Sequence, residues 1–241
     1  MALPVPPPEP EADDDRQDLS QLTHRRLVGI LGLALPLLLY LVAGLRPTTG
    51  LQGWELLPSV SAYYYTGAVG FFVGVLFALS LFLISYPGYK DARADRILGS
   101  IGGGAALGVA LFPTAAPDGV SAASWWTPAL RIVHYTSSVV LFVSFILFAL
   151  WLFRKSSVAN AADRPVDKRW RDRVCLACGI TMIVAVLWCS SSVVTHAPMF
   201  WPESIAIVAF AISWLAKGEA HRPLLRIWRF LTGGRGAPTA S

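Results

Sequence analysis

The sequence predicts an all-α protein, a six-helix transmembrane bundle with both termini in the cytoplasm. Hydrophobic residues make up 54% of its 241 residues and charged residues only 15%, against about 45–50% and about 25% in soluble globular proteins. The mean hydropathy is +0.53. Six apolar runs, most of them uncharged, approach the ~20 residues that cross the hydrocarbon core of a bilayer. Together these observations exclude an ordinary soluble domain.

The first segment, residues 1–26, is rich in proline and acidic residues. Such a composition cannot bury enough apolar surface to offset the entropy of ordering the chain. We therefore expect a disordered cytoplasmic tail before the first span.

The transmembrane domain is expected to cover residues 27–217. Each span is recognised as an apolar run of roughly twenty residues. The expected spans are 27–45, 67–86, 97–113, 129–153, 174–195 and 199–216.

Glycine spacing marks the second and third spans. Gly70 and Gly74 lie four residues apart in the second span, and Gly104 and Gly108 do so in the third. Small residues at this spacing let neighbouring transmembrane helices approach closely. The pattern predicts close packing inside the bundle and is compatible with a homo-oligomer formed through these spans.

Orientation follows from the positions of the 20 Lys and Arg residues. All but Arg46 and Arg131 lie in the two tails or in the segments after the second and fourth spans. Cytoplasmic loops retain positive charge, so both termini should lie in the cytoplasm. The net charge of +5 thus reports topology and does not indicate a nucleic-acid partner.

The last segment, residues 218–241, is a basic tail. On a helix, Arg222, Arg226 and Arg229 would share one face and apolar residues the other. A basic amphipathic helix of this kind suits the anionic inner surface of the membrane.

His134 and Glu203 lie several residues inside expected spans, where burying an ionisable group is costly unless it is paired or hydrated. His134 should lie about 7 to 8 Å below the outer edge and Glu203 about 6 Å, at 1.5 Å per helical residue. Arg131, Tyr64 and Ser61 are expected at the same end. The cytoplasmic half shows no comparable set, so we predict an outward-open polar cavity between spans two, four and six.

Several interpretations of this cavity stay open. His134, Glu203, Tyr64 and Arg131 could bind a ligand without chemistry. Alternatively, Ser61 could be a nucleophile with His134 as its base and Glu203 orienting the histidine.

A third interpretation is a divalent metal that activates water, although the sequence establishes no cofactor. Its candidate ligands are His134, His196, Glu203 and Asp118. In the purely structural interpretation, Glu203 forms an ion pair with Arg131 that joins the fourth and sixth spans.

Three stretches carry a resemblance to a known family. They are Ser59-Val-Ser-Ala-Tyr-Tyr-Tyr-Thr66, Gly108-Val-Ala-Leu-Phe-Pro-Thr114 and the run from Glu203 to Gly218. Over residues 29–218 the chain resembles a family of uncharacterised prokaryotic multi-span integral membrane proteins with no assigned activity. The resemblance implies an architecture and marks Ser61, Tyr64, His134 and Glu203, but it implies no reaction.

The sequence thus predicts a multi-pass protein of the bacterial cytoplasmic membrane, surrounded by membrane lipids, that binds or senses a lipid or small molecule. Two alternatives remain. One is an intramembrane hydrolase acting on a lipid-like substrate, and the other is a small-solute transporter. Whether the protein is an enzyme is left open.

Overall fold

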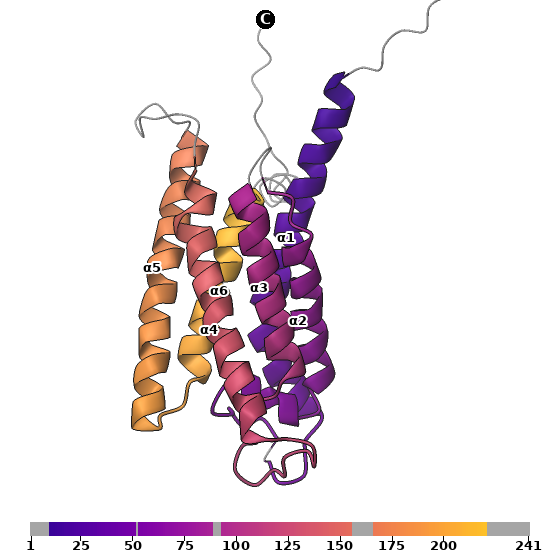
Figure 1. Cartoon of the computed structure of the whole chain (residues 1–241), viewed down its shortest axis with the longest axis vertical. Helices are drawn as coiled ribbons and strands as arrows, with labels where there is room; N and C mark the ends of the chain where they lie inside the picture. Colours follow the sequence, from indigo (N-terminus) through magenta and orange to yellow (C-terminus); the bar gives the residue numbers. More distant parts are fainter. Residues whose placement is uncertain (1–9, 52, 89–92, 156–165, 221–241) are drawn as a thin grey trace, which may run out of the picture.

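The computed structural model describes residues 10–51, 53–88, 93–155 and 166–220 (Figure 1). Within these ranges the chain is all-helical and contains no strand, which confirms the all-α part of the predicted fold class. The α-helices are α1 (Pro10–Leu45), α2 (Val69–Ile84), α3 (Arg93–Leu111), α4 (Pro128–Leu150), α5 (Val166–Thr195) and α6 (Phe200–Lys217). Two short 3-10 helices, η1 (Ser61–Tyr65) and η2 (Leu152–Arg154), precede α2 and follow α4.

Four helical segments in the described part of the chain are long and apolar enough to cross a membrane. They are Ser20–Leu45, Pro128–Arg154, Val166–Thr195 and Phe200–Lys217. Helix α2 is apolar but shorter, and α3 begins with three charged residues in its first turn. These lengths and compositions fit a protein that crosses a membrane several times.

Helices α1 and α5 begin at least eight residues earlier than the sequence suggested. Helix α1 starts at Pro10, inside the segment expected to be disordered, and α5 starts at Val166 instead of residue 174. Proline is favoured in the first turn of a helix, and acidic residues there complement the helix dipole. Both helices therefore extend with polar residues beyond their apolar runs. Residues 1–9 and 221–241 lie outside the described residues, and so does most of the predicted amphipathic tail.

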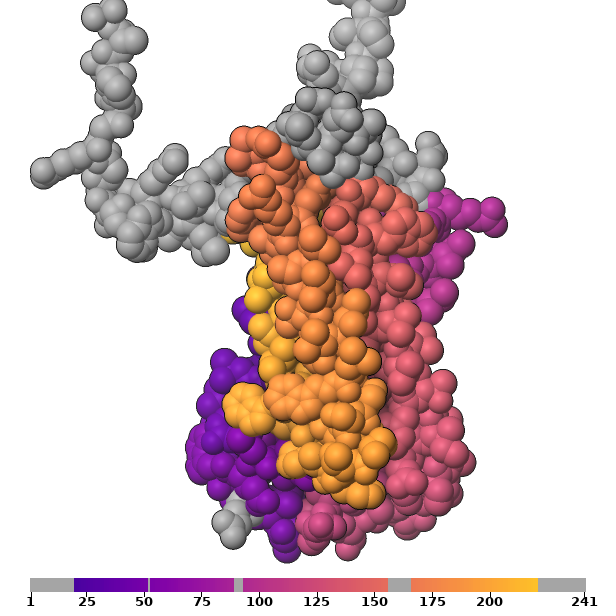
Figure 2. Space-filling model, turned by 90° about the vertical axis from the view of Figure 1, so that its left-hand side faces the viewer, coloured from indigo at the N-terminus to yellow at the C-terminus, as the bar shows by residue number. Residues whose placement is uncertain are grey.

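The helices close a ring. Each α-helix packs against the next one in the chain, and α6 packs back against α1 (Figure 1). The space-filling view shows α5 along one face, with α4 and α6 on either side of it (Figure 2). One end of the bundle carries η1 and residues 112–127, and we call it the η1 end. The opposite end carries Lys217, and we call it the Lys217 end.

Small residues allow α2 and α3 to pack closely. The Ser80 hydroxyl of α2 donates to the Gly103 carbonyl of α3 at 2.7 Å. By contrast, a side chain at Gly70, Gly74 or Gly104 would meet no atom within 4 Å. Gly99 and Gly103, which lie outside the predicted spacing, are the glycines of α3 that approach α2 most closely, whereas Gly108 lies against Ser137 of α4. The homo-oligomer stays a prediction.

The core near the Lys217 end is aromatic. Trp214 of α6 is fully buried, and its ring centroid lies 5.2 Å from Tyr86, 5.2 Å from Phe148 and 5.0 Å from Phe153. Lipid tails are as apolar as these side chains, so close van der Waals packing is what favours the folded bundle here.

Replacing Trp214 with alanine should therefore lower the free energy of unfolding by about 3 kcal/mol or more, because the cavity cannot close completely. Equilibrium unfolding in detergent micelles would measure the change. Trp201→Ala is the matched control, since Trp201 lies on the same helix but is 57% exposed. Equal effects of the two substitutions would contradict the packing described for Trp214.

Candidate functional site

The site is built on η1, which is held in place by the first turn of α6. The Pro58 carbonyl accepts hydrogen bonds from the amides of Met199 at 2.6 Å and Phe200 at 3.0 Å. In return, the Glu203 carboxylate accepts the amide of Val60 at 2.6 Å. This exchange fixes the turn immediately before Ser61.

A second anchor joins η1 to the segment after α3. The Tyr65 hydroxyl donates to the Thr114 carbonyl at 2.6 Å. Burial raises the pKa of the Tyr65 hydroxyl, so the group keeps the proton that it donates. The segments before α2 and after α3 are thereby tied together at the η1 end.

His134 and Ser61 lie in direct contact. The Nε2 atom of His134 is 2.9 Å from the Ser61 hydroxyl, and its Nδ1 atom is 2.6 Å from the Phe112 carbonyl. A carbonyl can only accept, so Nδ1 carries the proton and Nε2 is left as an acceptor for the hydroxyl. His134 is 1% exposed, so the imidazole is fixed by burial as well as by both hydrogen bonds.

The pairing of Ser61 with His134 agrees with the nucleophile–base interpretation, but the orienting group differs. The Phe112 carbonyl, and not Glu203, holds the far nitrogen of His134. Glu203 acts instead on the backbone of Val60. The carboxylate thus positions the turn that presents Ser61.

A cavity of about 290 Å³ lies beside this pair. Ser61, His134 and Glu203 line it together with residues of α4 and α5. The polar cavity was predicted between spans two, four and six, whereas α5 forms the wall that was expected from the second span. Its apolar lining residues include Val139, Phe142, Val186 and Val193.

A smaller cavity of about 50 Å³ lies deeper in the bundle. It shares Ser61, Ser138, Phe142 and Glu203 with the larger one, and α2 contributes Phe72, Leu76 and Leu79 to its otherwise apolar lining. Ser61, Ser138 and Glu203 therefore form a polar junction between the two cavities, and apolar residues line the rest of the smaller cavity and part of the larger one.

Other candidate residues lie away from this junction. Arg131 and Asp118 are exposed, and His196 is exposed in the turn after α5. Tyr64 packs its ring against Tyr65 and Phe72 and lines neither cavity.

These positions remove support from two interpretations. Among the described residues, no group of three or more His, Cys, Asp and Glu side chains could hold a metal ion. The proposed ligands His134, His196, Glu203 and Asp118 are therefore not gathered into one site. No ion pair joins Arg131 to Glu203 in the described structure, because the carboxylate instead accepts the Val60 amide.

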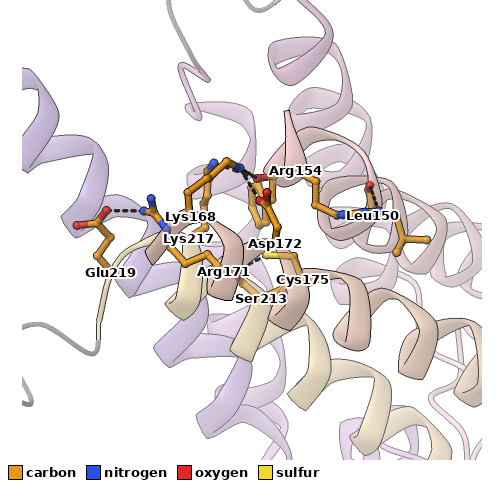
Figure 3. A network of polar contacts seen from close by, with 10 residues as sticks. Leu150, Arg154, Lys168, Arg171, Asp172, Cys175, Ser213, Lys217 and Glu219 are labelled. Atoms are coloured by element: carbon orange, nitrogen blue, oxygen red, sulfur yellow. Dashed lines mark hydrogen bonds and ion pairs between the residues drawn. The ribbon is translucent and has the colours of Figure 1, made fainter. Parts of the chain in front are cut away.

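A second polar cluster, at the Lys217 end, was not expected from the sequence (Figure 3). Lys217 is 4% exposed, and its ammonium donates to the Phe153 carbonyl at 3.1 Å. Lys168 donates to the same carbonyl and forms an ion pair of 2.5 Å with Asp172, while Arg171 pairs with Glu219. The i,i+4 spacing of Lys168 and Asp172 is a usable signal once α5 is known to begin at Val166.

Comparison with known proteins identified no relative of this chain. No protein-family model, curated protein or solved structure matches the chain. The function must therefore be inferred from the site itself.

The role of Glu203 can be tested by substitution. Glu203→Ala should lower the free energy of unfolding by about 1–3 kcal/mol, because the Val60 amide loses its acceptor in a partly buried place. Glu203→Gln keeps an acceptor oxygen and should retain most of the stability. Unfolding in detergent compares the two, and a glutamine variant as unstable as the alanine variant would show that the charge matters more than the hydrogen bond.

Proposed function

We propose that this chain is a six-span protein of the bacterial cytoplasmic membrane, with both termini inside, whose outward cavity binds a single-chain, lipid-like amphiphile. In this topology the η1 end faces outward. The Lys217 end then lies among the positively charged segments, as expected for a cytoplasmic side.

The observation that carries the proposal is the combination of a polar junction with an entrance on the side of the bundle. Val139 of α4 and Val193 of α5 line the larger cavity and are also 61% and 60% exposed. The mouth therefore lies at the outer surface between α4 and α5. In a membrane this surface contacts lipid, so an amphiphile could enter without first crossing water.

The cavity matches such a ligand in size and lining. Its volume of about 290 Å³ lies just below the roughly 300–1,000 Å³ usual for small-molecule sites. Ser61, His134 and Glu203 can hydrogen-bond a headgroup or an ester, while Phe142 and Val186 can contact a short hydrocarbon chain. Binding sites for small molecules commonly combine apolar walls with a few convergent polar groups.

The transporter alternative has less support. A carrier needs its polar groups to be reachable in turn from both sides of the membrane. Between Glu203 and Lys217, α6 places Phe210, whose ring stacks on Phe145 of α4 at 3.5 Å. This aromatic stack lies in the apolar core between the polar groups of the two ends.

Reporter fusions test the topology. A reporter active only outside the cytoplasm should be inactive after residue 241 and active when inserted near Gly119, since the exposed loop that holds this residue belongs to the η1 end. A reporter active only in the cytoplasm should give the opposite pattern. Activity of one reporter at both positions would contradict the six-span topology.

Filling the cavity tests the proposed binding. Val186 is half-buried and lines the cavity, whereas Val184 on the same helix is 58% exposed and does not. Val186→Trp should weaken the binding of mono-octanoylglycerol at least tenfold, as native mass spectrometry of the full chain would show. Val184→Trp should bind like the unmodified protein. Equal binding by the two variants would place the ligand elsewhere.

A further inference from the structure

We propose that Ser61 and His134 form a nucleophile–base pair that hydrolyses the ester bond of the amphiphile bound in the cavity. The inference rests on the binding function proposed above and adds a reaction to it. Three observations support the reaction: the distance between Ser61 and His134, the burial of His134, and the different contacts of the neighbouring serines.

The geometry meets the requirements of serine activation. A weak hydroxyl nucleophile needs a base within about 2.6–3.2 Å and a third group that orients the base. The distance from Ser61 Oγ to His134 Nε2 is 2.9 Å, and the Phe112 carbonyl orients the imidazole through Nδ1. A backbone carbonyl thus takes the orienting role that a carboxylate has in the Ser-His-Asp arrangement.

Ser61 differs from the other serines that line the cavity. Ser138 donates to the His134 carbonyl and Ser190 to the Val186 carbonyl, each one turn earlier on its own helix. The Ser59 oxygen accepts the Ala62 amide. Ser61 alone among these four contacts an imidazole, and like Ser138 it lines both cavities.

The reaction balances with water as the only co-reactant. Ser61 Oγ attacks the ester carbonyl carbon while Nε2 of His134 takes the hydroxyl proton. The tetrahedral intermediate collapses, the bond from the carbonyl carbon to the alcohol oxygen breaks, and His134 gives its proton to the departing alcohol. Water then attacks the acyl group on Ser61, His134 accepts a proton from the water and returns it to Ser61, and the carboxylic acid leaves.

The backbone around Ser61 indicates how the reaction should be detected. The amides of Val60 and Ala62 are already paired with Glu203 and Ser59. Donors for the developing oxyanion often supply a large share of the rate, and these two amides are occupied. Turnover is therefore expected to be slow, so covalent trapping of Ser61 is a more sensitive assay than product formation.

The test treats the full chain in detergent with octyl fluorophosphonate and locates the label by peptide mass spectrometry. Ser61 should be labelled, and Ser61→Ala should lose the label. Ser191→Ala, the matched control, should keep it, because Ser191 is exposed and lines neither cavity. His134→Gln should slow labelling by about 10²–10⁴-fold, the usual contribution of a general base. Thermal unfolding establishes that each variant is folded.

Incubation with para-nitrophenyl octanoate gives a second readout that does not need the histidine variant. An octanoyl group on Ser61 and its slow release as octanoate are expected with the unmodified protein and not with Ser61→Ala. A protein that binds mono-octanoylglycerol but is neither labelled nor acylated at Ser61 overturns the hydrolytic inference and leaves the binding proposal standing. Absence of both binding and labelling overturns both.

Discussion

The first turn of α6 and the turn before η1 satisfy each other's backbone polar groups, and the geometry of the η1 end depends on this exchange. Pro58 accepts two amides from α6, and Glu203 of α6 accepts the amide of Val60. In a lipid environment an unpaired backbone group costs several kcal/mol, by order of magnitude. The irregular segment that carries Ser61 is tolerated because another helix provides its partners.

The same requirement explains the cluster at the opposite end. The Phe153 carbonyl lies in η2, directly after α4, and accepts hydrogen bonds from both Lys217 and Lys168. One residue of α5 and one of α6 thereby share a single acceptor in η2. Buried ammonium groups need such partners, since removing a charge from water without compensation is unfavourable. The network joins α4, α5 and α6 where their apolar lengths end.

The sequence was sufficient for the all-α class and for the order of the helices, because apolar runs of span length leave few alternatives. Helix ends were less accurate for α1 and α5, whose polar first turns carry no hydrophobic signal. For the site, depth in the membrane identified His134 and Glu203 as unusual.

Depth could not reveal the partners of these two residues. The Phe112 carbonyl has no signature in the sequence, and the α5 wall of the cavity depends on how the ring closes. Arg131 illustrates the same limit, because it was expected at the same end as His134 and as a partner of Glu203, yet it is exposed.

Ring closure has a consequence for biogenesis. Ser61 is made early in synthesis, but the groups that hold its turn belong to α6, the last helix in the described part of the chain. His134, the base on α4, is also synthesised before α6. Until α6 inserts between α5 and α1, the nascent chain presents the Val60 amide and the Pro58 carbonyl without these partners. The cavity, which Glu203 of α6 helps to line, is therefore complete only after α6 has packed into the bundle, and a chain terminated before α6 would lack the partners of the Ser61 turn.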